Sequence, residues 1–169
     1  FIMVLKNLLV GQSGGPSAAI NASLAGVLAE GIASEKIGKV YGAVNGISGV
    51  LADHIQEMDM MENEELLHLL KITPAMALGS CRHKLAEIDS DPESYQKIEA
   101  VFDKYNIGYF FYIGGNDSMD TVDKLNRYFC RIKKDVKVIG VPKTIDNDLV
   151  MTDHTPGFGS AAKYLAVTV

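Results

Sequence analysis

Short apolar runs that each end in a glycine-rich or polar loop are the feature that most restricts how this chain can fold. The clearest are residues 5–10, 109–113 and 136–141. Near-continuous apolar runs of this length are typical of strands that are buried on both faces, as in a parallel sheet. Helical patterns separate them along the chain. The sequence therefore predicts an α/β fold, a mostly parallel sheet with helices on both faces in a three-layer, Rossmann-like αβα arrangement.

The spacing of apolar residues predicts helices between and after these runs. Asp91 followed by Pro92 marks the best helix start, because aspartate caps the first turn and proline suits its first position. A further strand is expected at 40–44, ended by a loop at 45–49. The helical stretches are carried by Ile20, Leu24, Val27 and Leu28, by residues 62–71, by Tyr95, Ile98, Phe102 and Tyr105, by Val122, Leu125 and Phe129, and by residues 161–169.

The composition indicates one soluble globular domain. The chain has 169 residues, of which 47% are hydrophobic, and this is enough to bury a sizeable core. A net charge of -5 disfavours nucleic acid or an anionic membrane as a partner. No apolar stretch approaches the roughly 20 residues of a membrane span and no signal peptide is recognisable, so a cytoplasmic location is expected. Cys81 and Cys130 are expected to be reduced thiols, and the four histidines show no metal-ligand spacing.

Residues 142–148, directly after the last apolar run, concentrate groups suited to catalysis. Open α/β sheets bind their ligands at the carboxyl ends of strands, where this segment is expected to lie. Either Asp146 or Asp148 can accept a proton from a substrate hydroxyl, while the other helps to hold a metal ion or orients its neighbour. Lys143 can neutralise charge on a transferring phosphoryl group, and Thr144 can hydrogen-bond the substrate. The alternative is a polar turn without a role, since aspartate and asparagine are common in turns.

The loop at residues 11–17 has the composition of a phosphate-binding turn. Gly11, Gly14 and Gly15 would let a phosphate approach the backbone closely, and the helix that follows favours anions at its first turn. The loop lacks the Gly-Lys-Ser/Thr ending of a Walker A motif and does not match GxGxxG. A tight strand-to-helix turn without a ligand remains the alternative.

A second loop, residues 114–118, combines Gly115, Asn116 and Ser118 with a carboxylate, Asp117. An acid in a phosphate loop either helps to hold a divalent cation or repels a negative group that would otherwise fit. Two unit charges about 4 Å apart, at an effective dielectric near 20, interact by roughly 4 kcal/mol, which is enough to choose between phosphate-bearing ligands. Arg82 adds a guanidinium suited to phosphate, with an exposed salt bridge as its alternative.

Together these segments resemble the 6-phosphofructokinase family over nearly the whole chain. The most specific matches are residues 142–148 and Gly114-Gly115, in the expected order, followed by residues 152–162. The resemblance implies a fold that forms the phosphoryl-donor lobe of such an enzyme. It also implies transfer of a phosphoryl group to the 1-hydroxyl of fructose 6-phosphate, assisted by Mg²⁺, in glycolysis.

The resemblance assigns roles to matching positions. Asp146 would be the general base that takes the proton of the 1-hydroxyl, with Thr144 and Asp148 beside that hydroxyl. Arg82 would contact the phosphates of the donor and stabilise the transferring group. The remaining donor-binding positions would be Gly11, Gly14, Gly15, Gly115, Asn116, Asp117 and Ser118. The family usually has a magnesium-holding aspartate where this chain has Asn116, so metal ligation there would pass through the amide carbonyl or a water.

The identity of the donor follows from two positions. Pyrophosphate-using members of the family typically carry Asp and Lys where ATP-using bacterial members carry glycine, and this chain has Asp117 and Lys143. A carboxylate at Asp117 would repel the α-phosphate of a nucleotide, and Lys143 would offset the charge of pyrophosphate. Pyrophosphate is therefore the expected donor. An ATP-dependent 6-phosphofructokinase and a non-catalytic phosphate- or nucleotide-binding module are the alternatives.

Members of the family are roughly twice as long as this chain or more. Residues 1–169 would thus be a truncated N-terminal donor domain, without the second lobe that supplies most of the fructose 6-phosphate site. Since phosphoryl transfer requires both substrates to be positioned in line, the chain alone is expected to be inactive. The family also implies a homo-oligomer for the full-length protein.

Overall fold

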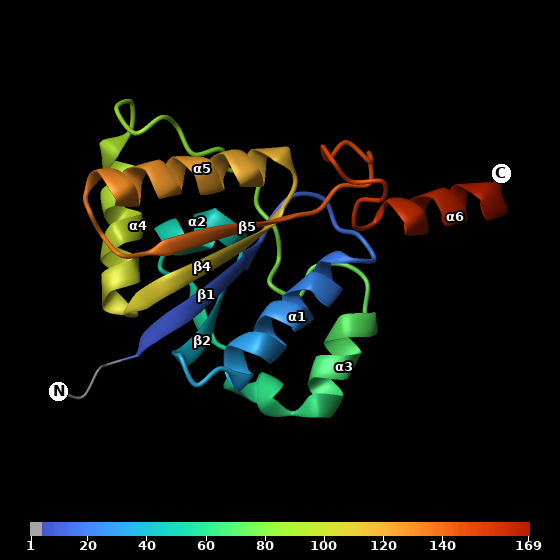
Figure 1. Cartoon of the computed structure of the whole chain (residues 1–169), viewed down its shortest axis with the longest axis horizontal. Coiled ribbons are helices and arrows are strands. Elements are labelled where there is room, and N and C mark those ends of the chain that lie inside the picture. Colours follow the sequence, from blue (N-terminus) through green and yellow to red (C-terminus); the bar gives the residue numbers. More distant parts are fainter. Residues whose placement is uncertain (1–4) are drawn as a thin grey trace.

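A five-stranded sheet with the strand order β3-β2-β1-β4-β5 organises the chain (Figure 1). This computed structural model describes residues 5–169, without the side chain of Met60. Strands β2, β1, β4 and β5 are parallel, and β3 is antiparallel at one edge. The predicted α/β fold with a mostly parallel sheet is confirmed. The strands are β1 (Lys6–Gln12), β2 (Ile37–Ala43), β3 (Ile55–Glu57), β4 (Ile107–Gly114) and β5 (Lys137–Pro142).

Helices cover both faces of the sheet, as the alternation of elements predicts (Figure 1). The described helices are α1 (Ile20–Ala33), α2 (Gly46–Leu51), α3 (Glu64–Ile72), α4 (Pro92–Lys104), α5 (Asn116–Arg131) and α6 (Phe158–Thr168), with a 3-10 turn, η1 (Asp59–Glu62). Asp91 caps α4 by accepting a hydrogen bond from the backbone N–H of Ser94 at 3.3 Å, which confirms the predicted helix start. No helix among residues 5–169 has the length and apolar character needed to cross a bilayer.

Aromatic packing fills the core between the sheet and helices α2, α4 and α5. Phe102 of α4 lies 5.5 Å from Phe110 of β4 and 5.4 Å from Phe129 of α5, measured between ring centroids. Leu9 of β1 is fully buried in the same cluster. Rings of this size bury much apolar area and dominate the energetics of a core. This packing fixes α5, and therefore its first turn, against the carboxyl end of β4.

The opposite face is covered by α1, α3 and η1, and only in part. Ile20, Leu24 and Leu28 of α1 are fully buried there, as their spacing predicts. Val27 is half-buried and borders an apolar hollow of about 550 Å³. Helix α1 contacts β1, β2 and β4, but the part of the sheet beside it stays open. The hollow is lined on the sheet side by Leu8, Ile37, Tyr109, Phe111 and Val141.

Two elements differ from the sequence-based expectation. Residues 46–51 form helix α2 where a loop at 45–49 was expected, and β3 was not expected at all. Asn45 and Gly46 have left-handed φ values of 63° and 57°, which is why the sequence has the character of a turn. The helix begins directly after that turn. β3 has three residues and gives no apolar signal.

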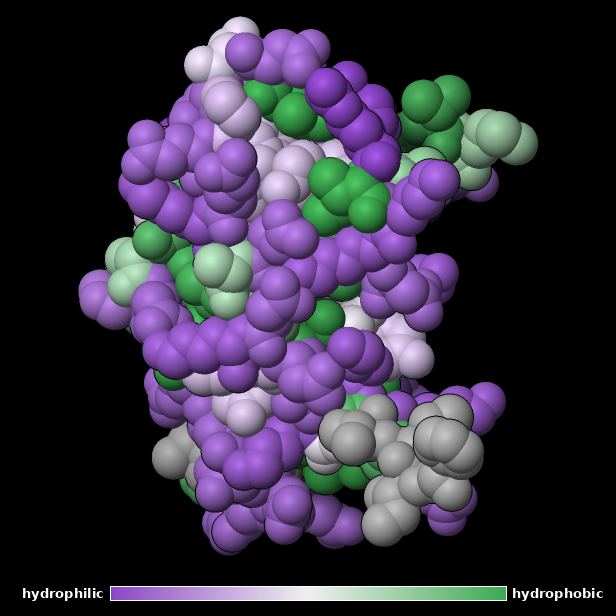
Figure 2. All heavy atoms as spheres, turned by 90° about the vertical axis from the view of Figure 1, so that its left-hand side faces the viewer, coloured by the Kyte–Doolittle hydropathy of each residue, from purple (hydrophilic) through white to green (hydrophobic). Residues whose placement is uncertain are grey.

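Figure 2 shows the end of the molecule where the parallel strands begin. Hydrophilic side chains cover most of this end, with separate hydrophobic patches between them. Ion pairs are part of this cover: Lys134 lies 3.0 Å from Glu99 and 2.6 Å from Asp103. The polar loops at residues 11–17, 114–118 and 142–148 lie at the other end of the strands, where α6 also extends away from the sheet (Figure 1).

Candidate functional site

The loops that follow β1, β4 and β5 meet at one edge of the sheet, because these strands are parallel neighbours. Two adjoining pockets of about 310 and 330 Å³ lie there and share Gly14, Gly115 and Asn116. The first is also lined by Ser13, Cys81, Arg82, His83, Asp117, Ser118 and Thr121. The second is also lined by Gly15, Pro16, Lys143, Thr144, Ile145 and Asp146. The loops after the three parallel strands thus converge at one site.

A buried amide network fixes the first loop. Gln12 is fully buried at the end of β1, and its Nε2 donates to the carbonyl of Ile20 at 3.2 Å and to Oδ1 of Asn21 at 3.0 Å. Its Oε1 accepts from the backbone N–H of Leu78 at 2.9 Å. Asn21 Oδ1 in turn accepts from the N–H of Ala77. Because each amide is hydrogen-bonded on both sides, α1 and the segment leading to Arg82 are held to the end of β1.

Lys143 connects the loop after β5 to the end of β4 and to the loop after β1. Its backbone N–H donates to the carbonyl of Gly114 at 2.8 Å, and its Nζ donates to the carbonyl of Gly15 at 2.7 Å. The residue is only 8% exposed. Burial lowers the pKa of the Lys143 ammonium, while the nearby Asp146 carboxylate acts in the opposite direction. The side chain thus places a partly desolvated positive charge in the wall of the second pocket.

The segment after Lys143 is folded back on itself by its own side chains. Thr144 is buried, and its Oγ1 accepts from the backbone N–H of Asp146 at 3.0 Å. Asn147 adopts a left-handed φ of 56°; its Oδ1 accepts from the N–H of Thr155 at 3.0 Å. The hydroxyl of Thr155 donates to the carbonyl of Thr144 at 2.9 Å. These bonds hold the backbone around Asp146 while its carboxylate faces solvent and the pocket.

Asn116 and Asp148 meet at the junction of the second and third loops. The amide nitrogen of Asn116 donates to Oδ2 of Asp148 at 3.3 Å. This leaves the carbonyl oxygen of Asn116 as its free acceptor. Amide and carboxylate oxygens are ligands of the kind that Mg²⁺ takes, usually with phosphate oxygens and water. Among the described residues 5–169, no group of three or more His, Cys, Asp or Glu side chains is placed to hold a metal ion.

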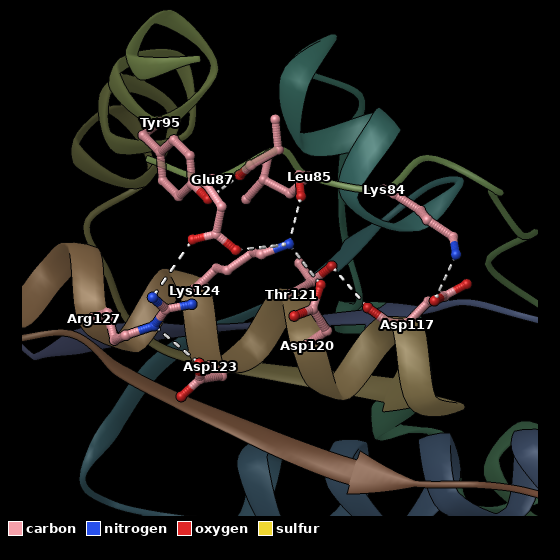
Figure 3. Close-up of polar contacts among 11 residues, drawn as sticks. Lys84, Leu85, Glu87, Tyr95, Asp117, Asp120, Thr121, Asp123, Lys124 and Arg127 are labelled. Carbon is pink, nitrogen blue, oxygen red and sulfur yellow. Dashed lines mark hydrogen bonds and ion pairs between the residues drawn. The ribbon is translucent and has the colours of Figure 1, made fainter. Parts of the chain in front are cut away.

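Asp117 lies in the first turn of α5, at the mouth of the first pocket (Figure 3). Its carboxylate pairs with Nζ of Lys84 at 2.9 Å, and both side chains are largely exposed. The residue before the helix, Gly115, has no side chain to cap the helix, so no side chain accepts from the first N–H groups of α5, and this helix start favours anions. The pocket therefore combines an anion-attracting helix start with one carboxylate that opposes a nearby negative charge.

Gly11 takes a different place from the other glycines. It is buried within β1 and lines neither pocket, and a Cβ at this position would lie 3.1 Å from the ring of Tyr112. The Tyr112 hydroxyl accepts from the backbone N–H of Ile47 at 3.2 Å and lies 3.7 Å from Sγ of Cys81.

Burial alone would raise the pKa of Cys81, but hydrogen bonds from the Ser48 backbone and Tyr112 outweigh it and lower the pKa.

The structure brings most of the predicted residues together at the pockets. Asp148 lies beside them through Asn116, whereas Gly11 lies beneath them. Ser80, whose hydroxyl donates to the carbonyl of Gly14 at 2.6 Å, was not predicted. Asn147 lies in the predicted segment 142–148 but was assigned no role there. No signal in the sequence points to Lys84 or Ser80, because their partners lie far away along the chain.

Comparison with known protein families adds a direct finding. The family described as Phosphofructokinase matches residues 7–169. The chain belongs to the phosphofructokinase family. The resemblance noted on the loops of the sequence is thereby confirmed.

Individual relatives agree with this assignment. The chain is 44% identical over 167 residues to a pyrophosphate–fructose 6-phosphate 1-phosphotransferase of Halomonas elongata, covering 98% of this chain and 40% of the relative. A crystal structure of a pyrophosphate-dependent phosphofructokinase from Nitrosospira multiformis matches with a TM-score of 0.89 and 43% identity, covering 96% of this chain and 40% of that one. An ATP-dependent 6-phosphofructokinase of Oceanobacillus iheyensis is 32% identical over 157 residues, covering 93% of this chain and 44% of the relative.

The chain therefore spans about 40% of the length of the curated pyrophosphate-using relatives that it matches. The pockets described above are built entirely from this part of the family fold. Whatever the remaining part of such relatives contributes to substrate binding lies outside the chain.

Proposed function

We propose that the chain is the phosphoryl-donor part of an enzyme that transfers a phosphoryl group from pyrophosphate to the 1-hydroxyl of fructose 6-phosphate, giving fructose 1,6-bisphosphate. The observation that supports this most is the placement of Asp117 and Lys143 on the two adjoining pockets, which share Gly14, Gly115 and Asn116. A carboxylate at the first pocket opposes the longer phosphate chain of a nucleotide. A buried ammonium in the second suits a small, highly charged donor.

The proposed chemistry assigns one task to each side chain. Asp146 takes the proton of the 1-hydroxyl as the oxygen attacks, since its carboxylate borders the pocket while its backbone N–H is fixed by Thr144. Lys143 stabilises charge on the transferring group, an interaction that gains strength because the ammonium is largely removed from water. Arg82 holds donor oxygens from the other side with its planar guanidinium.

Magnesium fits this arrangement in a limited way. The amide of Asn116 is hydrogen-bonded to the carboxylate of Asp148, so both residues offer oxygens in one region, and Mg²⁺ commonly takes one or two protein oxygens together with phosphates. When bound there, the ion would neutralise part of the negative charge of the donor. Asn116 would then take the place of the aspartate that is usual in the family.

The chain alone is proposed to bind pyrophosphate weakly and to catalyse no transfer, because it spans about 40% of its pyrophosphate-using relatives. In-line transfer needs the acceptor to be held as firmly as the donor. A role in glycolysis, a cytoplasmic location and a homo-oligomeric full-length enzyme belong to the same proposal, as does the description of residues 1–169 as a donor domain.

The donor assignment is tested in a protein of the relatives' full length that contains this chain. Turnover of fructose 6-phosphate is measured with pyrophosphate and with ATP in a coupled assay. Pyrophosphate is expected to be the better donor, and Asp117→Gly is expected to permit use of ATP. Asp117→Asn separates the causes, since it removes the charge and keeps the size. Asp123→Asn, on the same helix and outside both pockets, is the matched control.

Preference of the unaltered protein for ATP would favour the ATP-dependent kinase suggested by the Oceanobacillus relative. Failure of Asp117→Gly to gain any ATP turnover would show that charge and bulk at this position do not select the donor. Calorimetry with pyrophosphate, ATP and fructose 6-phosphate then addresses the chain by itself. Donor binding with no turnover in the full-length protein would favour a non-catalytic phosphate-binding module.

A further inference from the structure

Residues 84–87, shortly after Arg82, each contact a side chain of helix α4 or α5 (Figure 3). The Lys84 ammonium pairs with Asp117 of α5. The carbonyl of Leu85 accepts a hydrogen bond from Nζ of Lys124 at 2.9 Å. The carbonyl of Ala86 accepts a hydrogen bond from the Tyr95 hydroxyl of α4 at 2.6 Å. The carboxylate of Glu87 lies 3.5 Å from both Lys124 and Arg127 of α5. The loop has no helix or strand of its own here, so these contacts, together with the Leu85 side chain buried in the core, hold its path.

Lys124 is the central contact of this group. The residue is only 8% exposed although it is a lysine on a helix, and lysines are rarely buried unless they are paired. Its Nζ bonds Asp120 at 2.7 Å, one turn earlier on α5, and reaches Leu85 and Glu87 on the loop. One ammonium therefore joins the helix to the loop through three oxygen acceptors, and all three of its N–H groups have a partner.

The anchored segment begins two residues after Arg82. Upstream, the Ser80 hydroxyl holds the loop to the carbonyl of Gly14 at 2.6 Å. Arg82 lies between these two fixed points and lines the first pocket, and no carboxylate among the described residues 5–169 forms an ion pair with it. The position of the Arg82 backbone, and thus the point from which its side chain extends, is therefore set by these two fixed points.

We propose that Lys124 is a positioning residue for Arg82: it fixes the loop so that the guanidinium faces the donor phosphates. The inference rests on the proposed function, because it concerns the role of Arg82 at the donor. Lys124 lies outside both pockets and does not touch the substrate itself. Its effect on catalysis passes through the backbone of residues 82–85.

The test uses Lys124→Met in a protein of the relatives' full length that contains this chain. Methionine keeps an unbranched apolar stem in the helix and removes the three polar contacts. Since a misplacement of about 1 Å can cost on the order of 100-fold in rate, kcat with pyrophosphate is expected to fall about 10- to 100-fold. The KM for fructose 6-phosphate is expected to stay the same. Lys124→Arg, which retains the donors, should recover most of the activity.

Lys97→Met is the matched control. Lys97 forms the same kind of one-turn pair, with Glu93 at 2.8 Å, on an exposed surface of α4 away from the loop. Its replacement should leave kcat unchanged. If Lys97→Met lowers kcat as much as Lys124→Met does, the loss reflects general stability and the proposal is wrong.

A double-mutant cycle separates positioning from mere stabilisation. If Lys124 acts through Arg82, adding Lys124→Met to an Arg82→Gln protein changes kcat little, because the group that it positions is already gone. If the two losses multiply, Lys124 does not act through Arg82 and the proposal is overturned. Should Lys124→Met fail to fold, Lys124→Gln replaces it in the cycle and is judged by the same criterion.

Failure of the proposed function and failure of the positioning role of Lys124 give different results. A full-length protein that shows no pyrophosphate-dependent turnover contradicts the proposed function, and the role of Lys124 falls with it. A protein that is active with pyrophosphate, but whose losses at Arg82 and Lys124 multiply, contradicts only the positioning role.

Discussion

Replacement of Gln12 by leucine should destabilise the chain by disrupting the amide network beneath the first loop. Gln12 is fully buried and makes three hydrogen bonds, to Ile20, Asn21 and Leu78, at 3.2, 3.0 and 2.9 Å. Leucine is similar in size, so the change tests the polar contacts more than the packing. The main loss is at Leu78, whose buried backbone N–H would have no acceptor.

The magnitude follows from these contacts. A buried donor left without a partner costs about 1–3 kcal/mol, and each lost neutral hydrogen bond about 1 kcal/mol. Asn21 Oδ1 keeps the N–H of Ala77 as a donor, and the new apolar side chain offsets part of the loss. The free energy of unfolding is therefore expected to fall by about 2–4 kcal/mol, a large share of the roughly 5–15 kcal/mol of a typical domain.

Urea unfolding followed by circular dichroism measures this change. With a denaturant dependence of about 1–3 kcal/mol per molar for a small protein, the midpoint should fall by roughly 1–2 M. Gln96→Leu on the exposed side of α4 is the control and should leave the midpoint almost unchanged. Equal midpoints for Gln12→Leu and Gln96→Leu would refute the argument that the buried amide supports the fold.

Two further substitutions test the third loop. Lys143→Met is expected to stabilise the folded chain at pH 7 in thermal unfolding, because burial lowers the pKa of this lysine below its usual 10.5 and so makes its charged form costly. In the unaltered chain, the charged lysine lowers the free energy of unfolding by its full amount at any pH below the lowered pKa. This destabilisation disappears as the pH rises from the lowered pKa toward 10.5, so the gain in stability from Lys143→Met should shrink at alkaline pH. Asn147→Gly keeps the left-handed backbone but removes the bonds to Thr155 and Asp153, and it should cost about 1–3 kcal/mol in urea unfolding. A stability equal to that of the unaltered chain would mean that these bonds do not hold the loop.

The sequence predicts the four parallel strands, the polar loops after β1, β4 and β5, and the main helices, because these depend on local patterns. The apolar run at residues 109–113 marks a strand although Tyr109 and Phe111 are only half-buried beside the apolar hollow, and Asp91 caps a helix through a partner three residues away. Helix α2 has no such local signal. It is supported instead by a distant contact, the Tyr112 hydroxyl that accepts from the N–H of Ile47, and so only the tertiary structure reveals it.

The same distinction applies to the candidate site. Residue types, loop positions and the family resemblance made Lys143, Asp146 and Asp117 candidates, and the structure places all three at the pockets. The contact between Lys143 and Gly15 joins residues 128 positions apart, and that between Lys124 and Leu85 joins residues 39 positions apart. No periodicity in the chain marks such pairs, so a lysine that positions a loop resembles any lysine on a helix surface.

The distribution of these cross-links bears on what the chain can do by itself. The donor side is tied by side chains from one loop to another, through Ser80 to Gly14 and through Lys143 to Gly15. The other side is open: Val150 and Met151 are 91% and 101% exposed, and α6 buries none of its described side chains. Binding costs less when the binding groups are ordered beforehand. If the proposed function holds, the donor side is ordered before a small polyphosphate binds, whereas an acceptor sugar beside Asp146 would have to be ordered by contacts other than those of residues 150–168.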